Sequence, residues 1–262
     1  MSSDKATSAA LLGVYIALWD ALVDDDEEVR NLAARVVSKL LSRSLSPHEE
    51  EKPRHSPMSS ASVRPKLMEY IKTQDMWAKR LCEDAVLRLS GASASQRISS
   101  GTSSEAITSR IRPFSEMMSE ARKPDTALFV EEKQNLYIDE VEEARCWANV
   151  LLTSKYAEIA TTAISTLSTW TLDGLAHLAE VIASNEDGPL GWTAKPEVYT
   201  LGMRIISAAK VLIHRRVEID RCTMLLKDIL HKGTKNQLHE LWIVEIHEVL
   251  EAAGPDQETT TY

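Results

Sequence analysis

Residues 11–41 read Leu11-Leu-Gly-Val-Tyr-Ile-Ala-Leu-Trp-Asp-Ala-Leu-Val-Asp-Asp-Asp-Glu-Glu-Val-Arg-Asn-Leu-Ala-Ala-Arg-Val-Val-Ser-Lys-Leu-Leu41. The first half is apolar on nearly every side and predicts a helix over about residues 7–23 that needs neighbours on more than one face. After an acidic run, apolar residues recur from Val29 at i, i+3, i+4, i+7 and i+8, which predicts a second helix over about residues 26–42. The carboxylates at its start suit the positive end of the helix dipole.

This pair of helices is typical of a HEAT-type repeat. Asp24 stands in the turn, and Val29 and Arg30 begin the second helix, followed by small and aliphatic residues. One hairpin cannot bury its own faces, so further helical pairs should stack on it.

Helical spacing continues along the rest of the chain, and no segment has a strand pattern. Pro65 suits a first helical turn, a break is expected near Thr73, and Gly91 should end that helix. A capping box of Thr234 and Gln237 would start the last helix, which stops at Gly254. The expected helices cover about residues 65–89, 136–152, 155–183, 196–214, 217–231 and 235–253.

Two segments without periodicity, about 43–63 and 91–112, are rich in Ser and charged residues and predict disordered insertions. The tail over residues 255–262 is polar and predicted to be flexible. A solenoid tolerates such insertions because its repeats contact only their neighbours. The predicted fold is therefore all-α, a HEAT/armadillo-like α-solenoid of stacked hairpins in a single domain over residues 1–254.

The bulk properties exclude several classes of protein. The chain has 262 residues and a net charge of −9, which excludes a uniformly basic nucleic-acid coat but allows a local basic patch. No apolar run is long enough for a transmembrane helix, and no secretory signal opens the chain, so we expect a cytoplasmic location. Cys82, Cys146 and Cys222 are far apart and are expected to be buried free thiols.

No residue pattern predicts catalysis. His239 and His247 are eight residues apart, whereas a zinc-binding helix needs two histidines four apart around a glutamate. The carboxylate pairs Asp24–Glu28 and Asp139–Glu143 are interpreted as solvated helix faces rather than acid–base pairs. No serine sits in a nucleophile elbow. The sequence therefore predicts no catalytic, cofactor or metal site, and an enzyme would need a deep polar pocket with convergent titratable groups.

The densest basic segment lies around residues 204–221. If one helix continued through it, Lys210, His214 and Arg221 would share a face. Such a patch could bind phosphates, or its charges could simply solubilise an outer face. The candidate RNA-binding residues are Arg204, Lys210, His214, Arg215, Arg216 and Arg221.

A second polar segment opens the helix expected from Leu136, with Asn135 as its cap. These side chains could fix a turn or form an edge that binds a partner. The candidates are Glu131, Gln134, Asn135, Tyr137 and Asp139.

Two stretches resemble the C-terminal part of the THADA-type family, which comprises thyroid-adenoma-associated protein and its fungal relatives. They are Tyr15 to Ala34, with the acidic turn and Val29-Arg30, and Leu128 to Glu140, with Gln134-Asn-Leu-Tyr-Ile-Asp139, leading to Trp147. The likeness spans about residues 10–250, although family members are far longer than this chain.

The resemblance implies a long α-helical repeat protein without catalytic residues that regulates tRNA 2′-O-ribose methylation. Its implied partners are tRNA and an FtsJ-like, S-adenosylmethionine-dependent methyltransferase that modifies the ribose at anticodon-loop position 32. The scaffold would bind and place the tRNA while the enzyme transfers the methyl group. The alternative is a generic HEAT-like protein–protein interaction scaffold without an RNA role.

Overall fold

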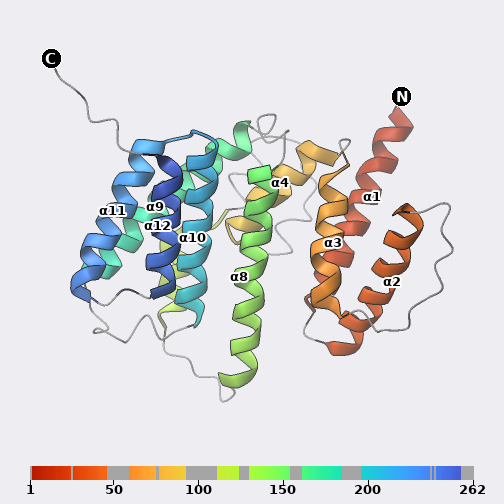
Figure 1. Cartoon of the computed structure of the whole chain (residues 1–262), viewed down its shortest axis with the longest axis horizontal. Coiled ribbons are helices and arrows are strands. Elements are labelled where there is room, and N and C mark those ends of the chain that lie inside the picture. The colour runs from red at the N-terminus through yellow and green to blue at the C-terminus, as the bar shows by residue number, and fades with distance from the viewer. Residues whose placement is uncertain are drawn as a thin grey trace. The chain divides into compact units, whose positions relative to one another are not determined.

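The computed structural model describes residues 2–24, 26–45, 59–74, 77–92, 111–123, 130–153, 161–184, 196–236, 238 and 240–254. Within these ranges, only the backbone is described at residues 2–10, 42–45, 78–79, 130–139, 162 and 234–236. Every regular element in the described ranges is a helix, which confirms the predicted all-α fold (Figure 1).

The helices group into two compact units, Met1–Leu81 and Cys82–Tyr262, and each is described by itself. The prediction of one repeat domain over residues 1–254 therefore stays a prediction. The helices are α1 (Ser2–Ala21), α2 (Glu27–Leu45), α3 (Ser60–Lys72), α4 (Ala78–Leu89), α7 (Phe114–Ala121), α8 (Val130–Thr153), α9 (Thr161–Ser184), α10 (Pro196–His214), α11 (Ile219–Asn236) and α12 (Glu240–Ala253).

In the first unit, α1, α2 and α3 pack on one another. Trp19 of α1 is buried beneath the guanidinium of Arg64, which lies 5.4 Å from the ring centroid. Tyr15 meets Tyr70 of α3 and Trp77 at centroid distances of 5.4 and 5.3 Å. These aromatic contacts join α1 to α3 and to the start of α4.

The acidic turn between α1 and α2 is held by its own carboxylates. Asp26 is the N-cap of α2: its Oδ1 accepts the backbone N–H of Glu28 at 2.7 Å. Asp24 Oδ1 accepts the N–H of Asp26 at 2.9 Å, and Arg30 Nη1 donates to the carbonyl O of Asp24 at 2.6 Å. The prediction that Asp24 belongs to the repeat turn is confirmed, and the spacing from Asp24 to Arg30 is explained by these hydrogen bonds.

Replacing Asp26 with Ala should destabilise the Met1–Leu81 unit by about 1 kcal/mol, because the first-turn N–H groups lose their acceptor. Urea unfolding followed by circular dichroism would measure the loss. Asp26→Ser is the control, since a serine hydroxyl can also cap α2 and should keep stability within a few tenths of a kcal/mol, about 0.3. Equal losses in both variants would contradict the capping role.

Two boundary predictions for this part of the chain fare differently. The break near Thr73 is confirmed, because α3 ends at Lys72 and Thr73 Oγ1 donates to the carbonyl O of Tyr70 at 2.7 Å. The first-turn position of Pro65 is wrong, because α3 already begins at Ser60 and Pro65 lies inside the helix.

The two insertions predicted at about 43–63 and 91–112 lie mostly outside the described residues, as does the tail 255–262. Of the residues predicted to be disordered, 43–45 belong to α2 and 60–63 belong to α3. Gly91 ends α4 as predicted, with φ of 74° and its N–H donating to the carbonyl O of Arg88 at 3.0 Å.

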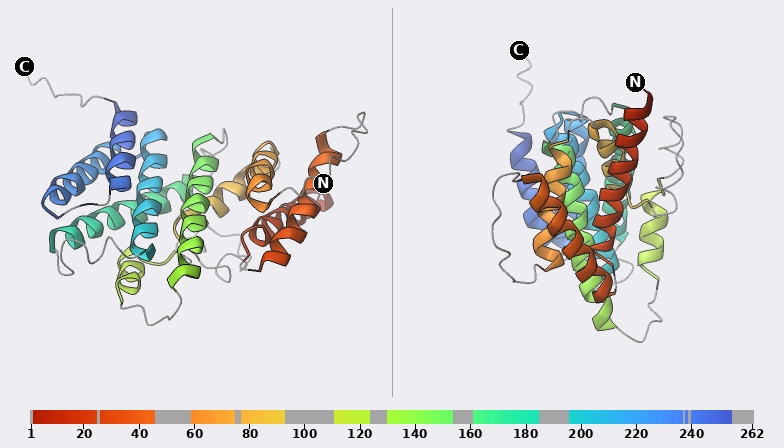
Figure 2. Two further views of the ribbon diagram at one scale, coloured as in Figure 1. Left: turned by 60° about the horizontal axis from the view of Figure 1, so that its bottom comes forward. Right: turned by 90° about the vertical axis from the view of Figure 1, so that its right-hand side faces the viewer.

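In the second unit, helices alternate between two layers. α8, α10 and α12 stand side by side in one layer, and α9 and α11 pack together in the other (Figures 1 and 2). Consecutive helices from α9 to α12 pack on one another, and this layered arrangement agrees with the helical repeat that the sequence predicts. α10 occupies the centre, because it contacts α8 and α12 in its own layer and α9 and α11 in the other.

α10 and α12 approach each other closely at Gly202. The Trp242 ring packs against the Gly202 backbone, so that a Cβ added there would lie 1.9 Å from Trp242 Cζ2. Trp242 is fully buried, stacks on Tyr199 at a centroid distance of 6.5 Å, and donates from Nε1 to the Tyr199 carbonyl O at 3.3 Å.

Three sequence predictions for this unit are wrong. The short helix α7, which packs on α9 and α10, is missing from them. α8 begins at Val130 instead of near Leu136, so Asn135 lies inside the helix and cannot be its N-cap. α11 continues to Asn236, which places Thr234 within that helix and excludes its role in a capping box for α12.

Two of the three cysteines, Cys82 and Cys222, are buried free thiols as predicted, and Cys146 is half-buried. Burial raises the pKa of the Cys222 thiol to about 11. Cys222 therefore stays protonated at neutral pH. None of the described helices combines the length and the apolar content that a membrane span requires.

Candidate nucleic-acid interface

The basic segment of the sequence spans the end of α10 and the start of α11, and a tight turn separates the two helices. The Val217 N–H donates to the carbonyl O of Leu212 at 2.9 Å, and the Arg216 N–H donates to that of Ile213 at 3.1 Å. This is a Schellman motif, in which glycine usually occupies the left-handed position. Here that position is held by Arg216, with φ of 59° and an exposed side chain.

Arg215, its neighbour, points into the fold. Its Nε donates to the carbonyl O of Leu151 at 2.8 Å, and its Nη2 donates to the same oxygen at 2.5 Å and to that of Leu152 at 3.3 Å. These carbonyls belong to the last turn of α8, where intrahelical donors are missing. The guanidinium thus caps α8, which gives Arg215 a structural role.

Arg204 has the same kind of role at the C-terminal end of α4. It is buried, with 8% of its surface exposed, and its Nη1 donates to the carbonyl O of Arg88 at 2.5 Å. That carbonyl lies in the last turn of α4. Arg204 and Arg215 therefore satisfy the C-terminal ends of two helices, and we remove both from the candidate surface.

The remaining candidates lie at the surface but do not share one helix face. α10 ends at His214, so the continuous helix that would have aligned Lys210 with Arg221 does not exist. Lys210 Nζ lies 3.5 Å from the carboxylate of Glu248, and Arg221 Nη1 lies 3.5 Å from that of Glu218. His214 is exposed at the last turn of α10.

One exposed cation of α11, Lys227, is missing from the sequence prediction. Cys222, Leu226 and Ile229 form the buried side of α11, whereas Arg221 and Lys227 are exposed. The spacing of Cys222, Leu226 and Ile229 at i, i+4 and i+7 is visible in the sequence, and it places Lys227 outside the buried side of the helix. We call Arg216, Arg221 and Lys227 the α10–α11 basic corner.

The layer of α8, α10 and α12 carries a different charge pattern. Arg145 of α8 bridges Glu142 at 2.8 Å and Glu245 of α12 at 2.6 Å. Tyr199 of α10 interacts electrostatically with these three charged side chains, and its partial burial raises the pKa of its hydroxyl group. The positive charge of Arg145 is offset by these two carboxylates, which disfavours phosphate binding at this network.

A buried charged cluster joins α4 to α8. Arg88 is 3% exposed, its Nη1 lies 3.2 Å from Glu143 Oε1, and its guanidinium lies 4.7 Å from the ring centroid of Trp147. The Trp147 Nε1 donates to the same Glu143 oxygen at 3.3 Å. Glu143, interpreted from the sequence as a solvated carboxylate, is thus half-buried and holds an arginine 55 positions away.

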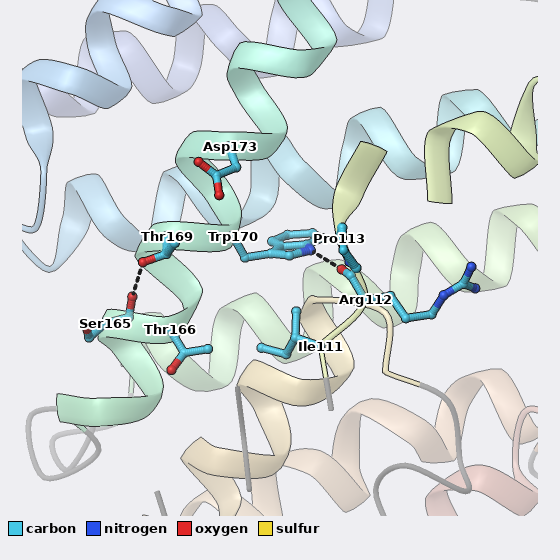
Figure 3. Close-up of a pocket in the computed structure, with 8 residues that line it drawn as sticks. All are labelled: Ile111, Arg112, Pro113, Ser165, Thr166, Thr169, Trp170 and Asp173. Carbon is cyan, nitrogen blue, oxygen red and sulfur yellow. Dashed lines mark hydrogen bonds between the residues drawn. The ribbon is translucent and has the colours of Figure 1, made fainter. Parts of the chain in front are cut away.

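An open cleft of about 440 Å³ lies between the segment before α7 and one side of α9 (Figure 3). Trp170 Nε1 donates to the carbonyl O of Arg112 at 3.0 Å across its floor. The Arg112 side chain points away from α9 (Figure 3). It pairs with Glu116 at 3.1 Å and with Glu120 at 2.8 Å. The full lining is Ile111, Arg112, Pro113, Ser165, Thr166, Thr169, Trp170 and Asp173.

This lining does not provide acid–base chemistry. It presents hydroxyl groups and one carboxylate, that of Asp173, and no side chain that could exchange a proton with it near neutral pH. Among the described residues, no group of three His, Cys, Asp or Glu side chains is placed to hold a metal ion. His239, one of the histidines considered from the sequence, lies outside the described residues.

A family model described as the Trm72 ARM-like repeat region matches residues 69–254. The chain belongs to this family. No curated protein and no solved structure matches the chain significantly. The predicted resemblance to the C-terminal part of the THADA-type family is confirmed, and membership indicates a role related to tRNA methylation.

The Trm72 ARM-like region begins within α3 and ends just after α12. It includes the Arg88 cluster, both helix-capping arginines and the α10–α11 basic corner, whereas α1 and α2 lie outside it. The alternation of α8 to α12 between two layers is consistent with the ARM-like repeat that the family description names.

The polar segment within this region lies in α8, and its interpretation as an edge that binds a partner stays a prediction. The backbone of residues 131–139 belongs to α8, but their side chains lie outside the described residues. A turn-fixing role for the segment as a whole does not fit a continuous helix. The candidates concerned are Glu131, Gln134, Asn135, Tyr137 and Asp139.

Proposed function

We propose that this chain is a non-catalytic helical-repeat subunit that supports tRNA ribose 2′-O-methylation. In this proposal an FtsJ-like methyltransferase modifies anticodon-loop position 32 in the cytoplasm, and the repeat protein holds the tRNA for it. The observation that carries the proposal is the match of residues 69–254 to the Trm72 ARM-like repeat region.

The residues of the chain suit a binding role better than a catalytic one. The cleft beside α9 lacks a convergent set of titratable groups, whereas stacked helices offer extended surfaces. Methyl transfer would then belong to the partner, which brings the S-adenosylmethionine site.

The α10–α11 basic corner is the surface we assign to tRNA. Arg216 lies in a tight turn with its side chain exposed, and Arg221 and Lys227 are exposed residues of α11. Phosphate binding by such cations releases counterions, so the affinity should fall steeply as salt rises. The chain as a whole has a net charge of −9, which would confine tRNA to local basic surfaces of this kind.

A reconstituted methylation assay tests the function. The full chain, the FtsJ-like methyltransferase of the same cell and unmodified tRNA are combined with S-adenosylmethionine carrying a labelled methyl group. We expect label at position 32 with both proteins present and little with either alone. If methylation is the same with and without this chain, and the chain does not bind tRNA, the alternative function of a protein–protein interaction scaffold would be favoured.

Arg216→Gly separates an RNA-binding role from a structural one. Glycine adopts the left-handed conformation without strain, so the variant should be as stable as the wild type or more stable by up to about 1 kcal/mol. It should nevertheless bind tRNA more weakly, by about 3–10-fold, with the salt slope reduced by about one phosphate contact. Filter binding or fluorescence anisotropy across a salt series measures both quantities.

Lys66→Gln is the matched control, because it removes one exposed positive charge from α3. Its tRNA affinity should equal that of the wild type. Arg215→Gln should instead lower stability, since α8 loses its cap. Unchanged affinity in Arg216→Gly, or an equal loss in Lys66→Gln, would remove the basic corner from the proposal.

A further inference from the structure

The cleft beside α9 has one wall of hydrogen-bond acceptors. Its polar side chains Ser165, Thr169 and Asp173 recur at i, i+4 and i+8, so they follow one another along α9 for about 12 Å (Figure 3). Thr169 Oγ1 donates its hydrogen to the carbonyl O of Ser165 at 3.3 Å, so this oxygen can only accept a hydrogen bond from a ligand. The Asp173 side chain is exposed and forms no ion pair within the described part of the chain.

The opposite wall is apolar. It consists of Ile111 and Pro113, which belong to the segment before α7. The Arg112 side chain between them points away from α9, and its guanidinium is held by Glu116 at 3.1 Å and Glu120 at 2.8 Å. Its positive charge is thereby offset, and the carboxylate on α9 makes the cleft acidic. A phosphate group would be repelled there, whereas a cation would be attracted.

An arginine side chain matches both walls. Its guanidinium carries several N–H donors in one plane and can bind a carboxylate and a hydroxyl oxygen at the same time. Its methylene groups can lie on apolar surface while the charge stays among polar groups. A lysine ammonium is a compact charge and would reach fewer acceptors along the helix. The cleft volume of about 440 Å³ lies within the usual range for ligand sites, so the residues flanking such an arginine can enter too.

We propose that the cleft beside α9 binds an arginine side chain of the FtsJ-like methyltransferase and forms part of the surface that meets this enzyme. The guanidinium pairs with Asp173 and donates to the hydroxyl oxygens of Ser165 and Thr169. The choice of the methyltransferase rests on the proposed function, whereas the choice of arginine follows from the two walls. The α10–α11 basic corner consists of other residues, so tRNA and the enzyme would not compete for the same side chains.

Small probes added to the full chain test the chemistry of the cleft. Nα-acetyl-arginine amide should shift the backbone amide signals of Ser165, Thr169 and Asp173 in ¹H–¹⁵N NMR spectra, with a Kd on the order of 1 mM. Nα-acetyl-citrulline amide has the same length but a neutral urea group, so it should bind about 3–10-fold more weakly. AMP, a nucleotide probe, should leave these signals unchanged.

Substitution of Asp173 tests the docking of the enzyme. Asp173→Asn keeps the size of the side chain and removes its charge, and it should raise the Kd of both the arginine probe and the methyltransferase about 3–10-fold. Biolayer interferometry measures the Kd of the methyltransferase. Glu180→Gln is the matched control, because Glu180 also belongs to α9, has 79% of its side chain exposed and does not line the cleft. Its Kd values should stay within about twofold of the wild type.

Each contrary result has a distinct meaning. If the arginine probe shifts no signal, or binds no better than the citrulline probe, the cleft does not recognise a guanidinium and the proposal is overturned. If AMP alone shifts the signals, the cleft is a nucleotide site instead. If the methyltransferase binds Asp173→Asn as tightly as the wild type, it docks elsewhere and the proposed function stands. If it does not bind the wild-type chain, the proposed function fails together with the partner named here.

Discussion

Gly202→Ala should destabilise the Cys82–Tyr262 unit by about 2–3 kcal/mol, although Ala is the better helix former by about 1 kcal/mol. The new Cβ would lie 1.9 Å from Trp242 Cζ2, and Trp242 is fully buried with its Nε1 bound to the Tyr199 carbonyl O. The indole cannot move without losing that hydrogen bond and its stacking on Tyr199. The midpoint of urea unfolding, compared at constant m-value, measures the loss.

Gly13→Ala is the matched control for this prediction. Gly13 lies inside α1, and a Cβ added there would meet nothing within 4 Å. The same substitution should therefore stabilise its unit by about 0.5–1 kcal/mol. The double variant Gly202→Ala with Trp242→Leu should lose less free energy of unfolding than the two single variants lose together, because the leucine side chain leaves room for the new methyl group. A gain of stability in Gly202→Ala would contradict the close packing of α10 and α12.

Local periodicity predicted the bounds of α10 well, because the helix expected over about residues 196–214 spans Pro196–His214. Val198, Leu201 and Ile205, which follow one another at helical spacing, are all buried. The pattern did not predict that Thr200 and Ser207 are buried too. Their burial follows from the central position of α10 between both layers, and that position depends on contacts between helices that are far apart in sequence.

The basic segment at residues 204–221 shows the same limit of prediction from local sequence. A cluster of arginines predicts charge, but the charge alone does not say how deep each guanidinium lies. Arg215 and Arg216 are adjacent, yet one caps α8 and the other is exposed, because the turn after His214 reverses the chain between them. The partner carbonyl of Leu151 is 64 positions away, so no local pattern could have shown it.

α7 was missed for a local reason. It spans only Phe114–Ala121 and follows a Ser- and Arg-rich segment, so its apolar side is too short to show a period. Two buried side chains, Phe114 and Met118, anchor it. Phe114 meets Trp170 edge to face at a centroid distance of 5.8 Å, a tertiary contact that a sequence pattern does not contain.

Glu143→Ala should destabilise the Cys82–Tyr262 unit by about 3 kcal/mol, because it removes the carboxylate that lies 3.2 Å from the buried guanidinium of Arg88. The Trp147 indole N–H loses its acceptor in the same variant. Urea unfolding measures the effect. Glu69→Ala is the control: Glu69 pairs with Lys72 at 3.1 Å with 68% of its side chain exposed, and an exposed pair contributes only about 0.5 kcal/mol.

Replacing both members of the buried pair separates charge from packing. Arg88→Met with Glu143→Leu removes the buried charge together with its carboxylate and should be more stable than Glu143→Ala, because apolar side chains of similar volume need no counter-charge. Arg204 keeps its acceptor in that variant, since it binds the Arg88 backbone carbonyl. If Glu143→Ala lowers the free energy of unfolding no more than Glu69→Ala does, the Arg88 charge is screened by solvent. If the double variant is less stable than Glu143→Ala, the ion pair itself holds α4 against α8.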